Sequence, residues 1–492
     1  SRETRFPRFC TRIVCVRVCL VCVCPIFRAP PAAMLPPRKD PEAEAPLLQR
    51  RRHDRAKGVW RSFVDFLYPL SVGDAEAKKG SVRLEALDAP RWIASIQIVC
   101  YHMYSDEVPF NRYATWFAVW TQFFFMLSGF VLSYTEVVRP ADKARQLSVL
   151  KYVRRRLIVI YPAYAFSLVL IIVGAAFSLT RFEWQILPLH VLLMQSWFPI
   201  CTGHGADISC AAWSFNGEAW FLSVLVLYWL ILRPLAAFFR QQSRPFCLMY
   251  ISASWVFCIV FHLAGHYNGL AGTIGCRSDV CINCVMVALR AGPFGYFHVF
   301  TSGIAAARIF VLSAMCDAET GGPPAADSRK LMLASSNAPC ALRYGCCIGY
   351  AIYVAVVLFA TDLIDPYYYF FHNGGLLPVM FFLVVGAAVG EDPLAVWLFR
   401  SKPMLVLGRI SYLQYLMQHI VRNQLASSFG WNQSTKIAFV PVLIVFSYLC
   451  HRFVERPATE YQRRRQESGV KGCDDRCIER LESMWDRCCS RE

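Results

Sequence analysis

An arginine and a histidine interrupt the otherwise apolar stretch "RWIASIQIVCYHMY", residues 91–104. In a helix, a separation of eleven residues brings the chain back to within about 20° of its start, so Arg91 and His102 share one face. They lie about 16 Å apart along the helix axis, with Ser95 between them. A guanidinium suits phosphate binding and an imidazole suits proton transfer. The structural alternative is an arginine that snorkels to one membrane surface and a histidine at the other.

Two further groups of ionisable residues border apolar segments. Glu218 follows "WSFN" at the start of a long apolar run. A carboxylate there could orient an imidazole or an acceptor hydroxyl, or it could simply lie exposed at a membrane surface. The cluster Arg154, Arg155 and Arg156 precedes the apolar run "LIVIYPAY". Its guanidinium groups suit phosphate binding, and they also suit a cytosolic membrane anchor.

Long apolar stretches must position these residues. The chain has 492 residues, of which 56% are hydrophobic and 17% charged, with a mean hydropathy of +0.37. Because about 20 apolar residues span a membrane as a helix, the sequence predicts an all-α polytopic membrane protein with about ten transmembrane helices. The predicted spans are 87–104, 115–135, 157–179, 211–232, 246–265, 294–315, 346–364, 376–398, 403–422 and 437–454. The shorter segment 184–198 holds Pro188 and His190, and we expect it to be one re-entrant or interfacial helix.

The distribution of lysine and arginine decides the orientation. If segment 184–198 does not cross, the loops assigned to the inside carry fifteen lysines and arginines, against six outside. This is the bias of the positive-inside rule, and it places both termini in the cytosol. A net charge of +17 then suits loops beside anionic lipid rather than a nucleic acid partner. His102 and Glu218 fall on the same, outer side.

The termini and the cysteines are interpreted separately. We expect residues 1–85 to be a disordered or non-native cytosolic segment, and 461–492 to be a basic, cysteine-containing cytosolic tail. The five cysteines between spans lie on the outer side, where disulfides can form, although the sequence leaves their pairing open. Cys281 and Cys284 form a CxxC without a second pair of zinc-like spacing, so no metal site is expected.

Several stretches, in order, resemble the acyltransferase 3 family of integral membrane acyltransferases. They are "LDAPRWIASIQIVCYH", "FFFMLSGFVLSY", "RRRLIVIYPAY", "LPLHVLLMQSWFP", "WSFNGEAWFLSVLVLYWL", "LGRISYLQYLMQH" and "VERPATEYQ". The resemblance covers roughly residues 86–460, which we take as one transmembrane domain. One departure concerns the third stretch, where the family carries a second arginine and this chain has Val159.

The resemblance implies acyl transfer from acyl-CoA, often acetyl-CoA, to a hydroxyl of a glycan or other acceptor. No cofactor is expected to stay bound, since acyl-CoA is a co-substrate. Catalysis would fall to His102 and Glu218, and CoA binding to Arg91 and Arg154–Arg156. Four residues of the family's Gln-x-Trp and Trp-Ser regions are candidates for acceptor binding: Gln195, Trp197, Trp213 and Ser214.

Two other functions remain open. Buried ionisable residues could instead line the pathway of a transporter or flippase. The chain could also be a catalytically inactive membrane scaffold that lost its CoA contact at Val159. The protein is expected to be a multi-pass membrane protein, and the sequence leaves open whether the membrane is that of the Golgi, the endoplasmic reticulum or the cell surface.

Overall fold

The computed structural model describes residues 84–104, 111–138, 149–175, 179–203, 207–266, 278–315, 340–364 and 366–467. The N-terminal segment expected at 1–85 lies outside the described residues except for its last two. The tail expected at 461–492 lies outside them beyond Glu467.

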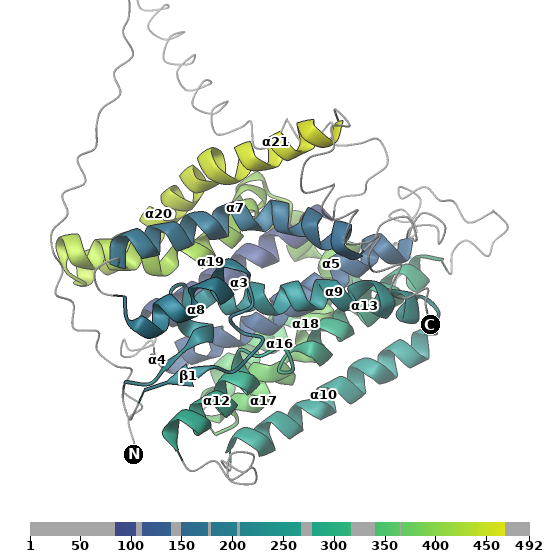
Figure 1. The fold of residues 1–492 in the computed structure, drawn as a ribbon. Coiled ribbons are helices and arrows are strands. Elements are labelled where there is room, and N and C mark those ends of the chain that lie inside the picture. Colours follow the sequence, from purple (N-terminus) through teal and green to yellow (C-terminus); the bar gives the residue numbers. More distant parts are fainter. Residues whose placement is uncertain are drawn as a thin grey trace, which may run out of the picture. The chain divides into compact units, whose positions relative to one another are not determined.

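Helices make up most of the described chain, as the sequence predicts (Figure 1). The α-helices are α3 (Asp88–Tyr104), α4 (Asn111–Ala114), α5 (Thr121–Val138), α7 (Val149–Ala175), α8 (Arg181–Val191), α9 (Trp220–Arg240), α10 (Arg244–His266), α12 (Asp279–Arg290), α13 (Phe297–Met315), α15 (Cys340–Arg343), α16 (Gly345–Phe359), α17 (Tyr368–Phe370), α18 (Leu377–Val389), α19 (Lys402–Phe429), α20 (Gln433–Cys450) and α21 (Arg456–Glu467). Short 3-10 or π-helical turns are η1 (Glu85–Leu87), η2 (Thr115–Trp120), η4 (Ala211–Trp213), η5 (Gly217–Ala219), η8 (Thr361–Leu363), η9 (Phe371–Gly375), η10 (Leu394–Phe399) and η11 (His451–Glu455).

Six helical segments of the described residues are long and apolar enough to cross a membrane. They are Thr115–Tyr134, Val149–Ala175, Gly217–Arg240, Arg244–Leu263, Tyr368–Val389 and Gln433–Tyr461. Two shorter apolar helices, Phe297–Ser313 and Gly345–Phe359, accompany them. The all-α membrane class is therefore supported. Because six helices of the described residues have sufficient length and hydropathy, the expected number of about ten spans is not confirmed. The two remaining expected spans form α3, which has 17 residues, and α19, which buries several polar side chains.

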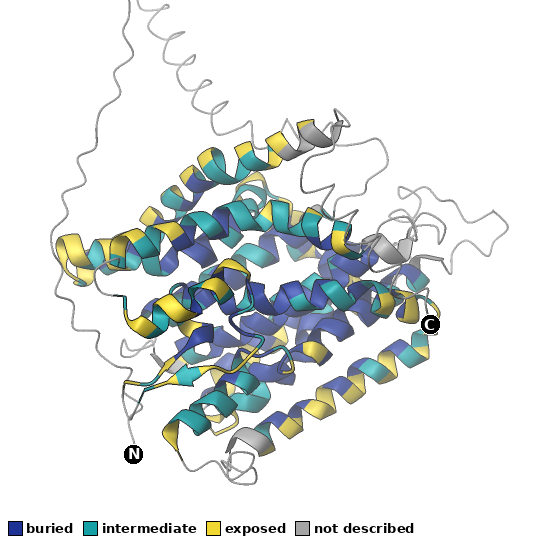
Figure 2. Cartoon of the chain, in the orientation of Figure 1, coloured by how far each residue is buried: buried dark blue, intermediate teal, exposed yellow. Residues whose placement is uncertain are grey.

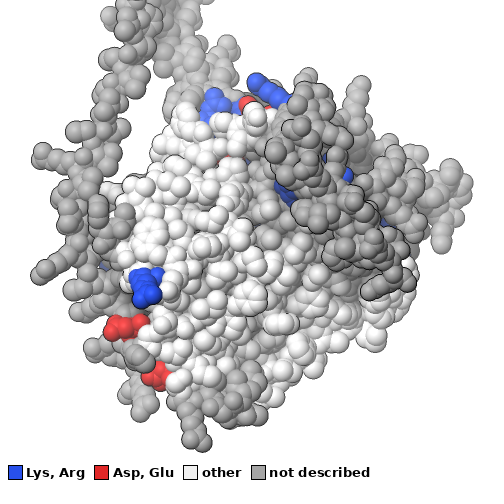
Figure 3. Space-filling model, in the orientation of Figure 1, with Lys and Arg blue, Asp and Glu red and all other residues white. Residues whose placement is uncertain are grey.

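The helix α10 shows how a membrane-facing helix differs from a core helix. Its buried residues recur every three or four positions, as one helical face requires: Cys247, Ile251, Ser254, Cys258 and Phe261. Its opposite face exposes large apolar side chains, such as Met249 at 62% and Val256 at 57% (Figure 2). Figure 3 shows a wide area without charged side chains on one face of the molecule. Such surfaces suit a lipid environment.

Small residues allow two pairs of helices to approach closely. A Cβ atom at Gly129 of α5 would overlap the backbone carbonyl of Phe300 in α13. A Cβ atom at Gly408 of α19 would likewise overlap the carbonyl of Asp88 in α3. Backbone contact of this kind is typical of helix pairs in membranes.

The segment between α8 and α9 contains the two strands of the described chain. The strands β1 (Cys201–Thr202) and β2 (Ser209–Cys210) are antiparallel and pair Cys201 with Cys210, which also form a disulfide. Cys281 is disulfide-bonded, whereas Cys284 is free. The CxxC motif therefore does not offer two thiolates to a metal.

Candidate active site

The helices α3 and α19 run in the same direction and bring two histidines together. The buried Ser95 hydroxyl of α3 donates to the carbonyl of Ser411 in α19 at 2.9 Å. Seven residues after Ser95 and eight after Ser411, each helix has advanced by about 11 to 12 Å. The residues at these positions are His102 and His419, whose ring centroids lie 5.6 Å apart. The geometry of one helix pair therefore places both imidazoles at the same level.

A short loop before α9 presents Glu218 to these histidines. The Asn216 side chain donates from Nδ2 to the carbonyl of Leu416 at 3.0 Å and to the Ser167 hydroxyl at 3.2 Å. The Tyr415 hydroxyl donates to the backbone carbonyl of Glu218 at 3.0 Å. These bonds fix the loop against α19 and α7, so the carboxylate enters the protein interior at a defined position.

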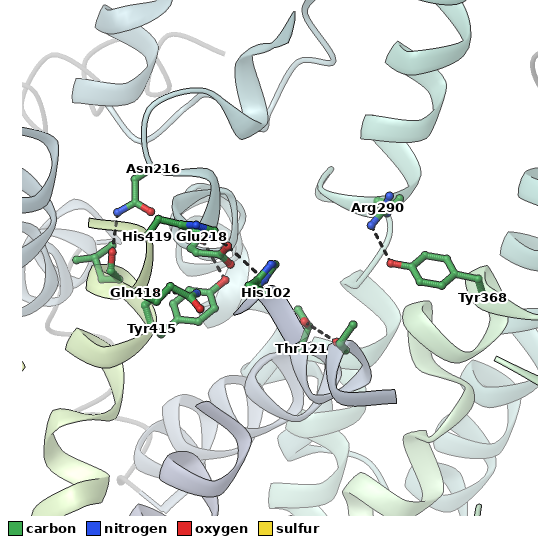
Figure 4. A network of polar contacts seen from close by, with 11 residues as sticks. His102, Thr121, Asn216, Glu218, Arg290, Tyr368, Tyr415, Gln418 and His419 are labelled. Atoms are coloured by element: carbon green, nitrogen blue, oxygen red, sulfur yellow. Dashed lines mark hydrogen bonds and ion pairs between the residues drawn. The ribbon is translucent and has the colours of Figure 1, made fainter. Parts of the chain in front are cut away.

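Glu218 links both imidazoles through one oxygen atom (Figure 4). Its Oε1 lies 3.0 Å from Nε2 of His419 and 3.2 Å from Nε2 of His102. A carboxylate only accepts hydrogen bonds, so both Nε2 atoms carry the hydrogen in this arrangement. In a neutral imidazole this leaves the Nδ1 lone pair of His102 available as a base. The glutamate side chain is only 5% exposed, whereas the two histidines are 28% and 34% exposed.

The same three residues have the composition of a metal site. One donor atom from each of His102, Glu218 and His419 lies within 4.8 Å of the others. Two histidines and a glutamate can hold zinc and leave a position for water or substrate. The donor set therefore fits a divalent cation, although the hydrogen bonds to Glu218 satisfy the three groups without one.

The cluster opens into a cavity of about 200 Å³. Half of its twelve lining residues carry aromatic or imidazole rings, and one is a cation; the residues are Ile98, Tyr101, His102, Ala118, Thr121, Trp213, Gly217, Glu218, Trp220, Arg290, His372 and Tyr415. They come from the last two turns of α3, the end of α12, the starts of α5 and α9, the turns η2, η4, η5 and η9, and α19. A small cavity with few polar groups at converging helix ends is typical of a binding or reaction site.

Arg290, the last residue of α12, forms the cationic side of the cavity. Its Nη2 donates to the Tyr368 hydroxyl at 2.8 Å, on the side of the cavity away from Glu218 in Figure 4. The guanidinium carbon also lies 5.0 Å from the centroid of the Tyr368 ring and 5.7 Å from that of Trp213. The cavity therefore has a carboxylate with two imidazoles at one side and a guanidinium held by aromatic rings at another.

Only one of the four expected acceptor-binding residues, Trp213, lines this cavity. The Gln195 side chain is buried and donates to the carbonyl of Ala219 at 3.1 Å. The indole of Trp197 donates to the carbonyl of Ser223 at 2.8 Å. The hydroxyl of Ser214 donates to the carbonyl of Cys210 at 3.0 Å. These three side chains hold the segment 195–214 in place.

The arginines expected to bind CoA lie on two helices that both pack against α19. Arg91 on α3 contacts Asp88 at 3.4 Å. On α7, Arg155 is exposed and Arg156 lies over the ring of Tyr152 at 5.2 Å. Val159, at the family's second arginine position, is 43% exposed. None of these arginines lines the cavity.

His190 at the end of α8 supports the loop rather than the cavity. Its ring packs edge-on against Phe215 at 4.9 Å, and its carbonyl accepts from the Tyr164 hydroxyl at 2.8 Å. Burial lowers the pKa of His190 to about 4, and a backbone contact with Ala211 partly opposes this shift. Phe215 has a φ of 52°, a left-handed conformation that is costly for a non-glycine residue and is found at functional sites. His190 is therefore a neutral packing residue beside the turn that leads to Glu218.

Two central residues of the site, His419 and Arg290, are not among the site residues predicted from the sequence. His419, near the outer end of the predicted span 403–422, is most simply interpreted from the sequence as an interfacial histidine. Its place on the same outer side as His102 is the signal that could have found it. Arg290 was counted only as a charge in an outer loop. Nothing in its local sequence indicates the cavity, because the residues around it come from helices far away in the sequence.

The comparisons with known proteins give one match. Residues 84–451 match a family model described as an acyltransferase domain, Acyl_transf_3. No curated protein and no solved structure matches the chain. The matched residues include α3, α9, α12 and α19 and hence the whole candidate site.

Proposed function

This chain belongs to the acyltransferase 3 family, and we propose that it transfers an acyl group, expected to be acetyl, from acyl-CoA to a hydroxyl of a glycan or another acceptor. The observation that carries the proposal is the 3.2 Å contact between His102 and Glu218 beside a cavity. A histidine oriented by a carboxylate is the usual base for acyl transfer to a hydroxyl.

The proposed step begins with the acceptor hydroxyl, which gives its proton to Nδ1 of His102 as its oxygen attacks the thioester carbon. The Glu218 carboxylate, bonded to Nε2, stabilises the positive charge that forms on the ring. The tetrahedral intermediate then collapses with cleavage of the carbon–sulfur bond. The departing CoA thiolate takes the proton from His102, so the products are the ester and free CoA.

In this proposal, the donor and the acceptor approach from opposite sides of the membrane. Arg91 and the cluster Arg154–Arg156 would bind CoA phosphates at the cytosolic side, where guanidinium groups match phosphate oxygens. Arg91 and His102 lie on one uninterrupted helix, α3, and are about 16 Å apart along it. That length is comparable to much of the extended pantetheine arm, which would carry the thioester towards His102.

Acyl transfer can be separated from the transporter and scaffold alternatives by one experiment. Purified protein is given radiolabelled acetyl-CoA with candidate glycans, and free CoA and labelled product are followed. We expect both to form with the wild-type chain and neither to form with His102→Ala. Movement of an unmodified solute without CoA release would support a transporter, and the absence of both activities would support a scaffold.

A further inference from the structure

Arg290 is a cation without a carboxylate partner among the residues that the structure describes. Among the described residues, its one hydrogen bond is the contact with the Tyr368 hydroxyl, and no acidic side chain lies within 4.0 Å of it. Its Nε is buried and makes no hydrogen bond. The acidic residue of the same cavity, Glu218, is engaged by two histidines.

The Arg290 guanidinium therefore has no anion beside it among the described residues, because the carboxylate of the cavity is bonded to the two histidines. Buried or half-buried cations are normally paired, because removing a charge from water is costly. The π-electrons of the Trp213 and Tyr368 rings partly stabilise the positive charge of Arg290. Such a cation–π contact stabilises a guanidinium less than an ion pair with a carboxylate or phosphate does. A guanidinium also has five N–H donors, and a single bond to Tyr368 leaves most of them unused.

We propose that Arg290 is an anion subsite for the acceptor, so that the chain acylates a hydroxyl compound carrying a carboxylate or a phosphate. This inference rests on the proposed acyl transfer and names the class of its acceptor. Arg290 and His102 line one cavity, so an acceptor held by its anion at Arg290 presents a neighbouring hydroxyl to the base. Planar donors on the guanidinium match two oxygens of either anion.

The size of the cavity limits how far the anion lies from the hydroxyl. At about 200 Å³ it is smaller than typical pockets for drug-sized ligands, which begin at about 300 Å³. It therefore takes one end of an acceptor rather than a long chain. A sugar acid or a sugar phosphate, with the anion and the hydroxyl on the same unit, has the required chemistry.

The test measures binding without acyl-CoA, using three probes that differ in charge. Methyl glucoside is neutral, methyl glucuronide adds a carboxylate, and glucose 6-phosphate adds a phosphate. Affinity is obtained from the ligand-dependent rise in thermal midpoint of the detergent-purified full chain. The variants are Arg290→Gln, Arg290→Lys and the control Arg422→Gln. Arg422 also lies over a tryptophan ring, that of Trp431 at 5.3 Å, but it does not line the cavity.

We expect the wild-type chain and Arg422→Gln to prefer one or both charged probes over methyl glucoside. In Arg290→Gln this preference should fall about ten- to hundred-fold, as expected for the loss of a charge-assisted hydrogen bond. Arg290→Lys should keep part of it, which shows that the site is folded and that charge is responsible. Preference for methyl glucuronide alone identifies a carboxylate subsite, and preference for glucose 6-phosphate alone identifies a phosphate subsite.

Several outcomes overturn the inference. Equal or absent binding of all three probes by the wild-type chain does so, and so does unchanged preference in Arg290→Gln. An equal loss for all three probes would make Arg290 a structural residue. Because binding is measured without acyl-CoA, these results do not depend on catalysis. In a transfer assay, an equal fall in kcat for neutral and charged acceptors would instead assign Arg290 to stabilisation of the tetrahedral intermediate.

Discussion

The imidazole rings of His102 and His419 lie 5.6 Å apart, edge to face, and share the Oε1 atom of Glu218. They come from the first and one of the last helices of the matched domain, which makes α3 and α19 a catalytic pair in the proposed reaction. The two histidines nevertheless differ in their surroundings, because only His102 is among the residues that line the cavity.

Replacing His102 with alanine should abolish acyl transfer while the purified chain keeps its gel-filtration profile. A positioned base contributes about 10²- to 10⁴-fold to the rate, so release of CoA should fall by at least this factor. His419→Ala should cause a smaller loss, because this ring acts through Glu218. A His102→Ala chain that retained more than about a tenth of wild-type turnover would rule out the proposed base.

Added Zn²⁺ should inhibit acyl transfer. Two imidazoles and a carboxylate within 4.8 Å of one another can bind zinc, and bound zinc would disrupt the hydrogen bonds that orient His102. His419→Gln should weaken this inhibition, because it removes one ligand while leaving His102 in place. Wild-type activity should persist in the presence of a chelator. Loss of activity on chelation, with recovery on adding zinc, would show instead that a metal takes part in the reaction.

Acidic pH should destabilise the folded chain through His190. Its folded pKa is lowered to about 4 from 6.5, so the unfolded chain takes up a proton below pH 6.5 that the folded chain does not. The contribution of neutral His190 to the free energy of unfolding is therefore fully present above pH 6.5. It decreases as the pH falls, by about 3 kcal/mol at pH 4. The fall in thermal midpoint between pH 7 and pH 5 should be smaller in His190→Gln. Parallel curves for the two chains would exclude His190 as a cause.

Arg156→Ala should raise KM for acyl-CoA more than KM for the acceptor. A contact with a phosphate contributes mainly to uniform binding, and loss of a charge-assisted pair corresponds to about a ten- to hundred-fold change. Val159→Arg, which restores the family's pair of arginines at an exposed position, should lower this KM or leave it unchanged. If Arg156→Ala alters neither KM nor turnover, the cluster serves only to orient the chain in the membrane.

Residues near the start of α20 should face the outer side. A cysteine at Gln433, which is exposed, should react with a membrane-impermeant maleimide added outside intact cells. The substitution leaves intact the Asn432 side chain that accepts from the Thr435 N–H and caps the helix. A cysteine at the exposed Gln241, in the loop after α9, should react only after permeabilisation. The reverse pattern would contradict the predicted topology. Labelling of the wild-type chain gives the background from its native cysteines, which is subtracted.

The sequence predicts the helices of this protein better than it predicts the site. Apolar runs locate the long helices, because hydropathy is a local property. The predicted segment 184–198 corresponds to the last eight residues of the 11-residue helix α8, whose start Thr180 caps, and to the turns that follow it. The polar helices α3 and α19 are the hardest to classify as spans, because the residues that form the site lower their hydropathy.

The site itself depends on contacts between distant segments. Arg91, His102 and Ser95 could be assigned to one face because helical periodicity is local. Glu218 was found through its resemblance to a family stretch. The meeting of His419 with Glu218 depends on the bonds between α19 and the loop before α9, and its proximity to His102 depends on the close approach of α3 and α19 at Gly408. No local pattern predicts either contact. For the same reason, Gln195 and Trp197 were assigned to the acceptor site, although both bond to the backbone near the start of α9.

The arrangement around Glu218 also has a consequence for biosynthesis. As the chain leaves the ribosome, α3 and the loop before α9 are made long before α19. Until α19 inserts, the glutamate has only His102 as a side-chain partner, and the loop lacks the bonds to Tyr415 and Leu416. A product that ends before α19 therefore lacks both the second histidine and the anchor of its carboxylate. Only the completed domain can therefore bring both imidazoles to the Glu218 carboxylate.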